Sequence, residues 1–365
     1  MKISHIKTQI VRLPAEEPLA DGPVAAGTTR DFVTLRIGTD AGIEGIGITF
    51  FGGALTGTLR TAVEALCALA VGEDPLRIEA VTAKLRAAAA SCGPGGVLTL
   101  ALAAIDIALW DIKGKALNLS ISKLAGGCRE RVPTYASGAL MRQFPLDAVL
   151  RAAPLLVERG FRQMKMQLAL PGNTSVPREV ERARLIRESV GGEIDLMCDI
   201  NQLWDVRQAI SIGRQIEDDR LYWLEDVVAH DDYAGLARVA AALDTPVAGG
   251  EYVYGSVPFR HMLEAGSVDI VMIDVLRSGG ITQWLKIAGM AEAFNLPVVS
   301  HLIPELHVHL IAAIPNGLTV EYMPWSAKLF KEIPLPHKGE LKVPDAPGLG
   351  LAFDEAVLRR YGTGA

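Results

Sequence analysis

Three carboxylates in this sequence recur at equal spacing, each at the end of a short apolar segment. Asp199, Glu225 and Glu251 follow one another at intervals of 26 residues. If neighbouring strands bring them together, the repulsion between three negative charges raises their pKa values unless a cation is bound. Ligands that offer only oxygen suit a hard ion with octahedral demand, so the pattern predicts Mg²⁺ rather than Zn²⁺. Asn201 is expected to share a face with Asp199 and to contact the substrate.

An aspartate and a histidine end two later apolar segments, at Asp274 and His301. A carboxylate beside an imidazole fixes its tautomer and raises its pKa, which makes it a better base near neutral pH. A divalent ion opposite such a base suits removal of the proton α to a carboxylate, because the ion stabilises the resulting enediolate. Glu321 ends the last apolar segment and, if protonated, is expected to donate to the same substrate carboxylate.

A lysine and a glutamine lie two residues apart in the stretch "FRQMKMQLA", as Lys165 and Gln167. In a β-strand successive side chains point to opposite faces, so these two polar side chains share one face of an otherwise apolar strand. We therefore expect both to point into the same site as the carboxylates.

The elements that must position these residues start near Val132. Short β-rich segments alternate there with helical stretches such as 177–191 and 284–295, which indicates a parallel sheet. Eight such segments at a period of about 25 residues indicate a closed (β/α)8 barrel, whose strands carry catalytic groups at their C-terminal ends. The predicted strands are 132–137, 162–168, 194–200, 222–226, 246–251, 269–275, 297–301 and 318–322.

The residues before this repeat have a mixed α+β pattern. Segments 3–13 and 32–50 alternate like strands, and "TDAG" between two halves of the second is a hairpin signal. Helical patterns follow at 57–71, 76–90 and 98–118. The last is apolar on almost every side, which predicts a helix buried between layers.

Composition narrows the class of protein. The chain has 365 residues and a formal net charge of −6, without a Lys/Arg cluster, so we expect no nucleic-acid partner. No apolar run approaches the length of a membrane span, so no membrane association is expected. The N-terminus lacks the apolar region of a signal peptide, and the four cysteines form no CxxC pair. These features predict a cytoplasmic protein with reduced cysteines.

The chain resembles the enolase superfamily and, within it, the mandelate racemase subgroup. The resemblance runs nearly end to end through "TDAGIEGIG", "AAIDIALWDIKGKALNLSISKLAGG", "DINQ", "WLED", "GGE", "DVLRSGGIT", "VVSH" and "PGLGLAFDE". It implies a modified (β/α)7β TIM barrel at 126–330, an α+β capping domain at 1–125, and a C-terminal segment at 331–365 that returns to the cap. Capping loops near 16–28 and 49–56 are expected to set specificity, and the protein is expected to form a homo-oligomer.

The resemblance also implies roles for the site residues. Asp199, Glu225 and Glu251 would bind Mg²⁺, Asp274 and His301 would form the catalytic dyad, and Glu321 would bind the substrate carboxylate, as would Lys165. Two positions depart from the subgroup. Its second strand usually ends in Lys-x-Lys, whereas Gln167 replaces the second lysine here. Its usual Glu-Glu-Pro is Glu225-Asp226-Val227.

The first departure shapes the predicted reaction. An amide has no useful basicity, so a racemase loses one of the two bases that it needs. His301 alone is sufficient for dehydration of an acid sugar, because it can remove the α-proton and then protonate a β-hydroxyl that leaves from the same face. The product is a 2-keto-3-deoxy acid, and Gln167 is then expected to form a hydrogen bond with a substrate hydroxyl. The alternatives are a racemase, epimerase or cycloisomerase that uses Lys165 and His301, and an inactive barrel that only binds metal and an anion.

Overall fold

A computed structural model describes residues 1–20, 28–170, 172 and 175–363. Near the N-terminus an antiparallel sheet contains β1 (Ile3–Pro14), β2 (Thr29–Thr39) and β3 (Glu44–Thr49). The chain reverses between β2 and β3 through "TDAG", where Gly42 has a φ of 75° and its N–H donates to the Thr39 carbonyl at 3.1 Å. Glycine adopts this left-handed conformation at no steric cost. The predicted hairpin is therefore confirmed.

Three helices accompany this sheet: α1 (Thr56–Ala70), α2 (Ile78–Ala88) and α3 (Gly96–Leu117). Helix α3 is buried along most of its length, because it contacts β3 and α1 on one side and the barrel helices α10 and α11 on the other. Two glycines of β3 allow the close approach: a Cβ on Gly47 would lie 2.0 Å from the Ala104 carbonyl oxygen, and one on Gly45 would lie 2.2 Å from that of Ala108. The predicted buried helix is confirmed.

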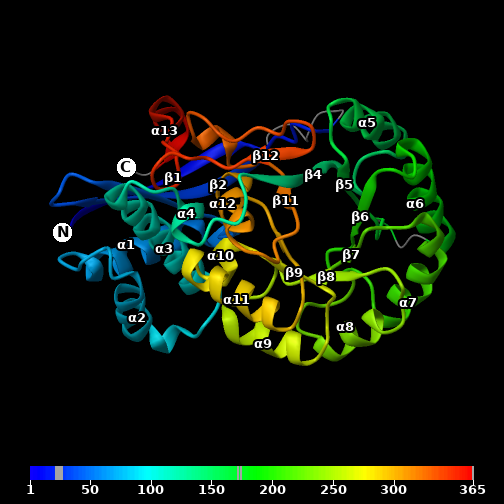
Figure 1. Ribbon diagram of the computed structural model, residues 1–365, viewed down its shortest axis with the longest axis horizontal. Coiled ribbons are helices and arrows are strands. Elements are labelled where there is room, and N and C mark those ends of the chain that lie inside the picture. Colours follow the sequence, from blue (N-terminus) through cyan, green and yellow to red (C-terminus); the bar gives the residue numbers. More distant parts are fainter. Residues whose placement is uncertain (21–27, 171, 173–174, 364–365) are drawn as a thin grey trace.

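The rest of the chain forms the predicted barrel (Figure 1). Its strands are parallel neighbours in the order β10-β9-β8-β7-β6-β5-β4-β11. Between the edges β10 and β11, the Val298 N–H donates to the Asn316 carbonyl and the Leu318 N–H donates to the Val298 carbonyl, so the barrel is nearly closed. The strands are β4 (Arg131–Leu140), β5 (Gln163–Gln167), β6 (Asp195–Asp199), β7 (Leu224–Glu225), β8 (Val247–Gly249), β9 (Ile270–Ile273), β10 (Val298–Ser300) and β11 (Val320–Tyr322).

Helices cover the outside of the barrel, as Figure 1 shows. Amphipathic helices pack their apolar faces on the strands and leave polar faces outward. The barrel helices are α5 (Leu146–Glu158), α6 (Val176–Val190), α7 (Val206–Gln215), α8 (Tyr233–Ala240), α9 (Ser256–Glu264), α10 (Val275–Ser278), α11 (Ile281–Ala293) and α12 (Pro304–Ala313), with the short α4 (Ile121–Leu124) between cap and barrel. Helix α12 differs from the amphipathic ones, because all of its residues are buried.

The C-terminal segment contacts both parts of the molecule. Strand β12 (Glu340–Lys342) pairs with the start of β4, helix α13 (Glu355–Tyr361) contacts β1, and β13 (Gly362–Thr363) pairs with β1. Buried Asp111 of α3 accepts the N–H groups of Ile46 and Leu349, both at 2.9 Å, and so connects the cap sheet, α3 and this segment. The domain limits at 125 and 330 stay a prediction.

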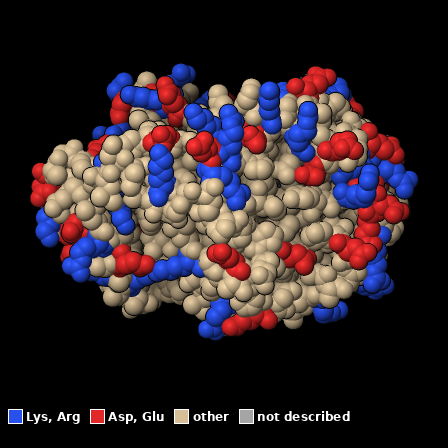
Figure 2. All heavy atoms as spheres, viewed as in Figure 1, with Lys and Arg blue, Asp and Glu red and all other residues tan. Residues whose placement is uncertain are grey.

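The surface carries charges of both signs. Figure 2 shows Lys and Arg side chains interspersed with Asp and Glu across the visible face. Among the described residues, no helix is both long and apolar enough to cross a membrane. All four cysteines are free thiols, with Cys67 and Cys198 buried and Cys92 and Cys128 exposed.

The contact between β3 and α3 gives a stability prediction. Gly47→Ala should lower the free energy of unfolding by about 1–3 kcal/mol, because the new methyl group overlaps the backbone of α3. Gly57→Ala is the matched control, since a Cβ there meets nothing within 4 Å and helix propensity favours alanine. Urea unfolding of both variants measures the difference, and equal stabilities would contradict the packing described here.

Candidate active site

The C-terminal ends of the barrel strands converge on one pocket of about 290 Å³. Strand register explains part of the convergence, because Gln167 pairs with Asp199 and Asp199 pairs with Glu225 across β5, β6 and β7. Most of the predicted site residues line the pocket, and Glu225 and Asp274 lie directly behind it in contact with Lys165 and His301. The predicted residues that line it are Lys165, Gln167, Asp199, Asn201, Glu251, His301 and Glu321.

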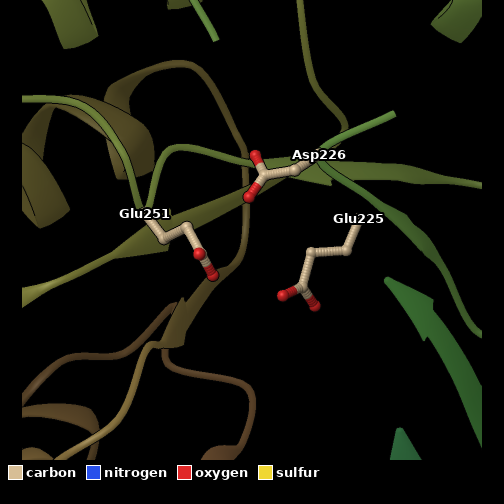
Figure 3. Close-up of side chains that lie close together, drawn as sticks. All are labelled: Glu225, Asp226 and Glu251. Atoms are coloured by element: carbon tan, nitrogen blue, oxygen red, sulfur yellow. The ribbon is translucent and has the colours of Figure 1, made fainter. Parts of the chain in front are cut away.

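Three buried carboxylates lie close enough to share one cation. Oxygens of Glu225, Asp226 and Glu251 all lie within 4.8 Å of one another, and Figure 3 shows the three side chains directed toward a common space. Burial raises the pKa of Glu225 to about 7 and those of Asp226 and Glu251 well above the usual range, and mutual repulsion adds to it. Asp226 Oδ2 is buried without a hydrogen-bond partner. A hard divalent cation fits this donor set, since it would satisfy the orphaned oxygen and the excess charge.

Asp199 is held differently from the other two predicted metal ligands. Its Oδ2 accepts from Gln167 Nε2 at 3.1 Å, and its Oδ1 accepts from the Asn201 N–H at 2.7 Å. In the cluster of three carboxylates, Asp226 occupies the position that was expected for Asp199. In the sequence Asp226 was noted only as part of the departure from the subgroup's Glu-Glu-Pro. The residue has a φ of 44°, in the left-handed region. No pattern of strand alternation could have shown that this conformation directs its side chain toward Glu251.

Lys165 lies between two carboxylates. Its Nζ is 2.6 Å from Glu225 Oε1 and 2.9 Å from Glu321 Oε1. Burial alone would lower the pKa of Lys165, but the charges of Glu225 and Glu321 outweigh burial and raise it well above its usual value. Burial would likewise raise the pKa of Glu321, yet Lys165, His301 and the Leu302 N–H at 2.6 Å lower it to about 2. The protonated Glu321 that was expected to act as a donor is therefore disfavoured in this arrangement.

The aspartate and histidine form a hydrogen-bonded pair. His301 Nδ1 is 2.8 Å from Asp274 Oδ2, while Asp274 Oδ1 caps helix α10 by accepting the N–H groups of Leu276 and Arg277, both at 2.8 Å. On the other side of the ring, His301 Nε2 is 3.2 Å from Glu251 Oε2. Burial would lower the pKa of His301, but Glu251 and the bond to Asp274 raise it to about 8. Asp274 thus fixes the ring and leaves Nε2 directed toward the carboxylates.

Gln167 belongs to a polar network that includes a residue missed in the sequence, Arg142. Gln167 Nε2 donates to Asn201 Oδ1 at 3.1 Å as well as to Asp199, and Arg142 Nη2 donates to Asn201 Oδ1 at 2.7 Å. The first barrel strand was predicted to end at Ser137, whereas β4 continues to Leu140. Arg142 then lies two residues past the strand end, as Asn201 does after β6, and a longer predicted strand would have identified it.

The cap contributes side chains to the pocket from the predicted loop at 49–56. Phe51, which lines the pocket, has a φ of 69°, and its ring stacks on His301 with centroids 6.1 Å apart and planes 13° apart. The Arg277 guanidinium lies over the same Phe51 ring, 3.9 Å from its centroid. The cap therefore covers the dyad directly. Of the predicted loop at 16–28, residues 21–27 lie outside the described residues.

Comparisons with known proteins agree with this geometry. Residues 6–126 match the family model described as the mandelate racemase / muconate lactonizing enzyme N-terminal domain, and residues 147–357 match the model described as enolase C-terminal domain-like. The chain is 32% identical to the L-talarate/galactarate dehydratase of Salmonella typhimurium, over 98% of this chain and 90% of that protein. It is 31% identical to the 3,6-anhydro-alpha-L-galactonate cycloisomerase of Streptomyces coelicolor, over 99% of this chain and 100% of that protein.

A solved structure shows the same architecture. The L-talarate dehydratase from Polaromonas sp. JS666, complexed with Mg and L-glucarate, superposes with a TM-score of 0.91 at 32% identity. The superposition covers 100% of this chain and 98% of that one. The cap and the barrel are thus arranged in both proteins in the same way.

The cluster of Glu225, Asp226 and Glu251 predicts that Mg²⁺ stabilises the folded protein against unfolding. Mg²⁺ at a hundredfold excess over its dissociation constant should stabilise the protein by about 2.7 kcal/mol, and a chelator should reverse the effect. Glu251→Gln should reduce this stabilisation strongly, because it removes one of the three clustered charges. Glu264→Gln is the control, since Glu264 pairs with Arg260 on the surface of α9. Thermal unfolding measures all three proteins, and an equal response to Mg²⁺ in each would contradict a metal site here.

Proposed function

Because this chain belongs to the mandelate racemase/muconate lactonizing enzyme family of the enolase superfamily, we propose that it is a Mg²⁺-dependent acid-sugar dehydratase. One observation carries the proposal. The pocket presents a histidine–aspartate dyad from β9 and β10, while β5 presents the neutral amide of Gln167. An enzyme with one proton-transfer group suits a reaction in which the same group acts as base and then as acid.

The metal would be held by oxygen ligands at the strand ends. The proposed ligands are Asp199, Glu225 and Glu251, and the position of Asp226 makes it a further candidate. When bound, Mg²⁺ supplies Lewis-acid stabilisation of the negative charge that develops on the substrate carboxylate. Lys165, whose Nζ is 2.9 Å from Glu321 and 2.6 Å from Glu225, adds a fixed positive charge beside the same group.

Two proton transfers at His301 account for the reaction. Asp274 keeps a proton on Nδ1, so the lone pair of Nε2 takes the proton from the carbon α to the carboxylate. The electron pair of the broken C–H bond passes into the carboxylate to form an enediolate. The pair then returns to form a carbon–carbon double bond, the β-carbon–oxygen bond breaks, and His301 gives its proton to the departing hydroxide. Water leaves, and the enol tautomerises to a 2-keto-3-deoxy acid.

The remaining site residues would bind and orient the substrate. Glu321 is ionised and accepts from both Lys165 and the Leu302 N–H, so we propose that it positions Lys165 against the substrate carboxylate. Asn201 and Gln167 line the pocket beside Asp199, and their amides can meet substrate hydroxyls. Their mutual hydrogen bond, with Arg142 behind, holds both amides in a fixed orientation.

A cycloisomerase is the second candidate. The similarity to the 3,6-anhydro-alpha-L-galactonate cycloisomerase covers 99% of this chain, and His301 would serve as a proton-transfer group in a cycloisomerase as well. A racemase or epimerase would need Lys165 as a second base, yet its ammonium is tied to two carboxylates. A cytoplasmic location and a homo-oligomeric state stay predictions.

Product analysis tests the proposal. With Mg²⁺ and a panel of aldonic and aldaric acids, we expect 2-keto acid formation, detected with semicarbazide. His301→Asn should lower kcat by about 10⁴-fold, because it removes both the base and the acid. His261→Asn is the matched control, because His261 is exposed on α9 and 48% of its side chain is accessible.

Two results would separate the candidates. An isomeric product without any 2-keto acid would favour the cycloisomerase. If no panel member yields a 2-keto acid or an isomer, or if His301→Asn retains the wild-type rate, the proposed reaction is wrong.

A further inference from the structure

The side of the pocket opposite the cluster of Glu225, Asp226 and Glu251 is mostly apolar. In strand order, β4 and β11 lie across the barrel from β7 and β8, which carry Glu225, Asp226 and the approach to Glu251. A substrate whose carboxylate faces the metal at the cluster of Glu225, Asp226 and Glu251 therefore directs its other end toward β4, β11 and the cap. Side chains that line this second side are mostly apolar: Met141, Met323 and Trp325, with the hydroxyl of Ser137.

A buried carboxylate of the cap, Glu17, lies at this second side. Both of its oxygens are 3.1 Å from Trp325 Nε1, and only 5% of its side chain is exposed. A Cβ on Gly138 of β4 would lie 2.7 Å from Glu17 Oε2, so the carboxylate rests directly against that strand. Burial raises the pKa of Glu17, and repulsion from Glu321 adds to the rise. Glu17 therefore lies directly behind Trp325, which lines the pocket.

Cations near this second side are already engaged. Arg30 forms an ion pair with Glu17, and its guanidinium stacks 3.9 Å from the centroid of the Trp325 ring. Among the described residues that line the pocket, the basic side chains are those of Lys165, Arg277 and His301. Lys165 is paired with Glu225 and Glu321, and His301 with Asp274 and Glu251.

Two further arginines are also held in place. Arg277 lies between the rings of Phe51 and Tyr252 and donates to the Glu251 carbonyl at 3.0 Å. Arg142 is outside the lining and donates to Asn201. A second substrate carboxylate at the β4–β11 side would thus lose water and lie near Glu17, which sits behind Trp325 of the lining. Among the described lining residues, the cation that is not paired with a carboxylate is Arg277, and it is stacked on Phe51 at the His301 side. Burial of a charge without a partner is strongly unfavourable.

We propose that Glu17 is a specificity-determining residue that rejects dicarboxylic sugar acids, so that the substrate is a monocarboxylic sugar acid. The inference rests on the proposed function and narrows its substrate class. A repulsive element of this kind gives specificity by penalising the wrong ligand. The apolar lining favours a remote end rich in carbon-bound hydrogen, as in a deoxy or anhydro aldonic acid. The specificity would therefore differ from that of the relative solved with L-glucarate, a dicarboxylate.

Matched acid pairs test the proposal. We would compare kcat/KM for aldonic and aldaric acids of the same carbon number and configuration, such as gluconate with glucarate and galactonate with galactarate. The wild type should prefer the monoacid by about 100-fold or more, since like charges brought together cost several kcal/mol. Glu17→Gln should lower this ratio at least about tenfold, because it removes the repulsion and releases Arg30 toward a second carboxylate.

Glu16→Gln is the matched control. Glu16 is the neighbouring residue, but its side chain is 49% exposed and pairs with Lys328 on the surface, so the ratio should stay at the wild-type value. A wild-type preference for diacids would overturn the proposal. An unchanged ratio in a folded Glu17→Gln variant would do the same.

Binding measurements keep this test independent of the reaction. Calorimetry with Mg²⁺ and His301→Asn compares the affinities of gluconate and glucarate without turnover. If no acid is dehydrated, the proposed function fails, whereas the affinity ratio still decides the selectivity. Equal affinity for both acids overturns the role of Glu17, even if Glu17→Gln does not fold.

Discussion

Negative charge buried at one end of the barrel is the constraint on which the rest of this structure depends. Six carboxylates are almost inaccessible to solvent there: Asp199, Glu225, Asp226, Glu251, Asp274 and Glu321. Lys165 and His301 each contact two of them, and among the described ion pairs none reaches Asp199 or Asp226, so the negative charge exceeds the positive charge. Removal of charged groups from water is costly unless each is paired, so the site is built to be completed by a cation. The raised pKa values of Glu225, Asp226 and Glu251 have the same cause, because burial and mutual repulsion disfavour their ionised forms.

The cap makes this charged site usable for chemistry. Helix α3 links the cap sheet to the barrel, because Gly45 and Gly47 of β3 pack closely against it while α10 and α11 contact it from the barrel. Phe51 then covers His301, and Glu17 closes the opposite side beside Trp325. Exclusion of water strengthens the electrostatic interactions inside the pocket. The same packing that stabilises the fold therefore also sets the polarity at each end of the substrate.

Much of this organisation could be predicted from the sequence, and the failures have physical reasons. The apolar strands and the polar residue at each strand end follow from the alternation and the period of apolar residues. The barrel, the histidine–aspartate dyad and Lys165 could therefore be predicted. Asp226 was not, because its side-chain direction depends on a left-handed backbone conformation that no propensity indicates. Arg142 was hidden by a strand end predicted three residues too early.

Long-range contacts were out of reach for a different reason. Glu17 meets Trp325 across 308 positions of sequence, and only the packed arrangement of cap and barrel brings them together. The charge state of Glu321, which was expected to be protonated, likewise depends on distances that a sequence does not show. With Lys165 at 2.9 Å, the ionised form is favoured. A pattern shows which residues can do chemistry, but their charge states depend on neighbours that only the fold supplies.

Proton transfer on a single face, by His301 with no partner base at Gln167, is the central claim. The most direct measurement is the isotopic and stereochemical analysis of unreacted substrate recovered from turnover in D₂O. Deuterium is expected at the α-carbon only with retained configuration, because one group removes and returns the proton. Recovery of the deuterated epimer would show a second base on the other face and would contradict it.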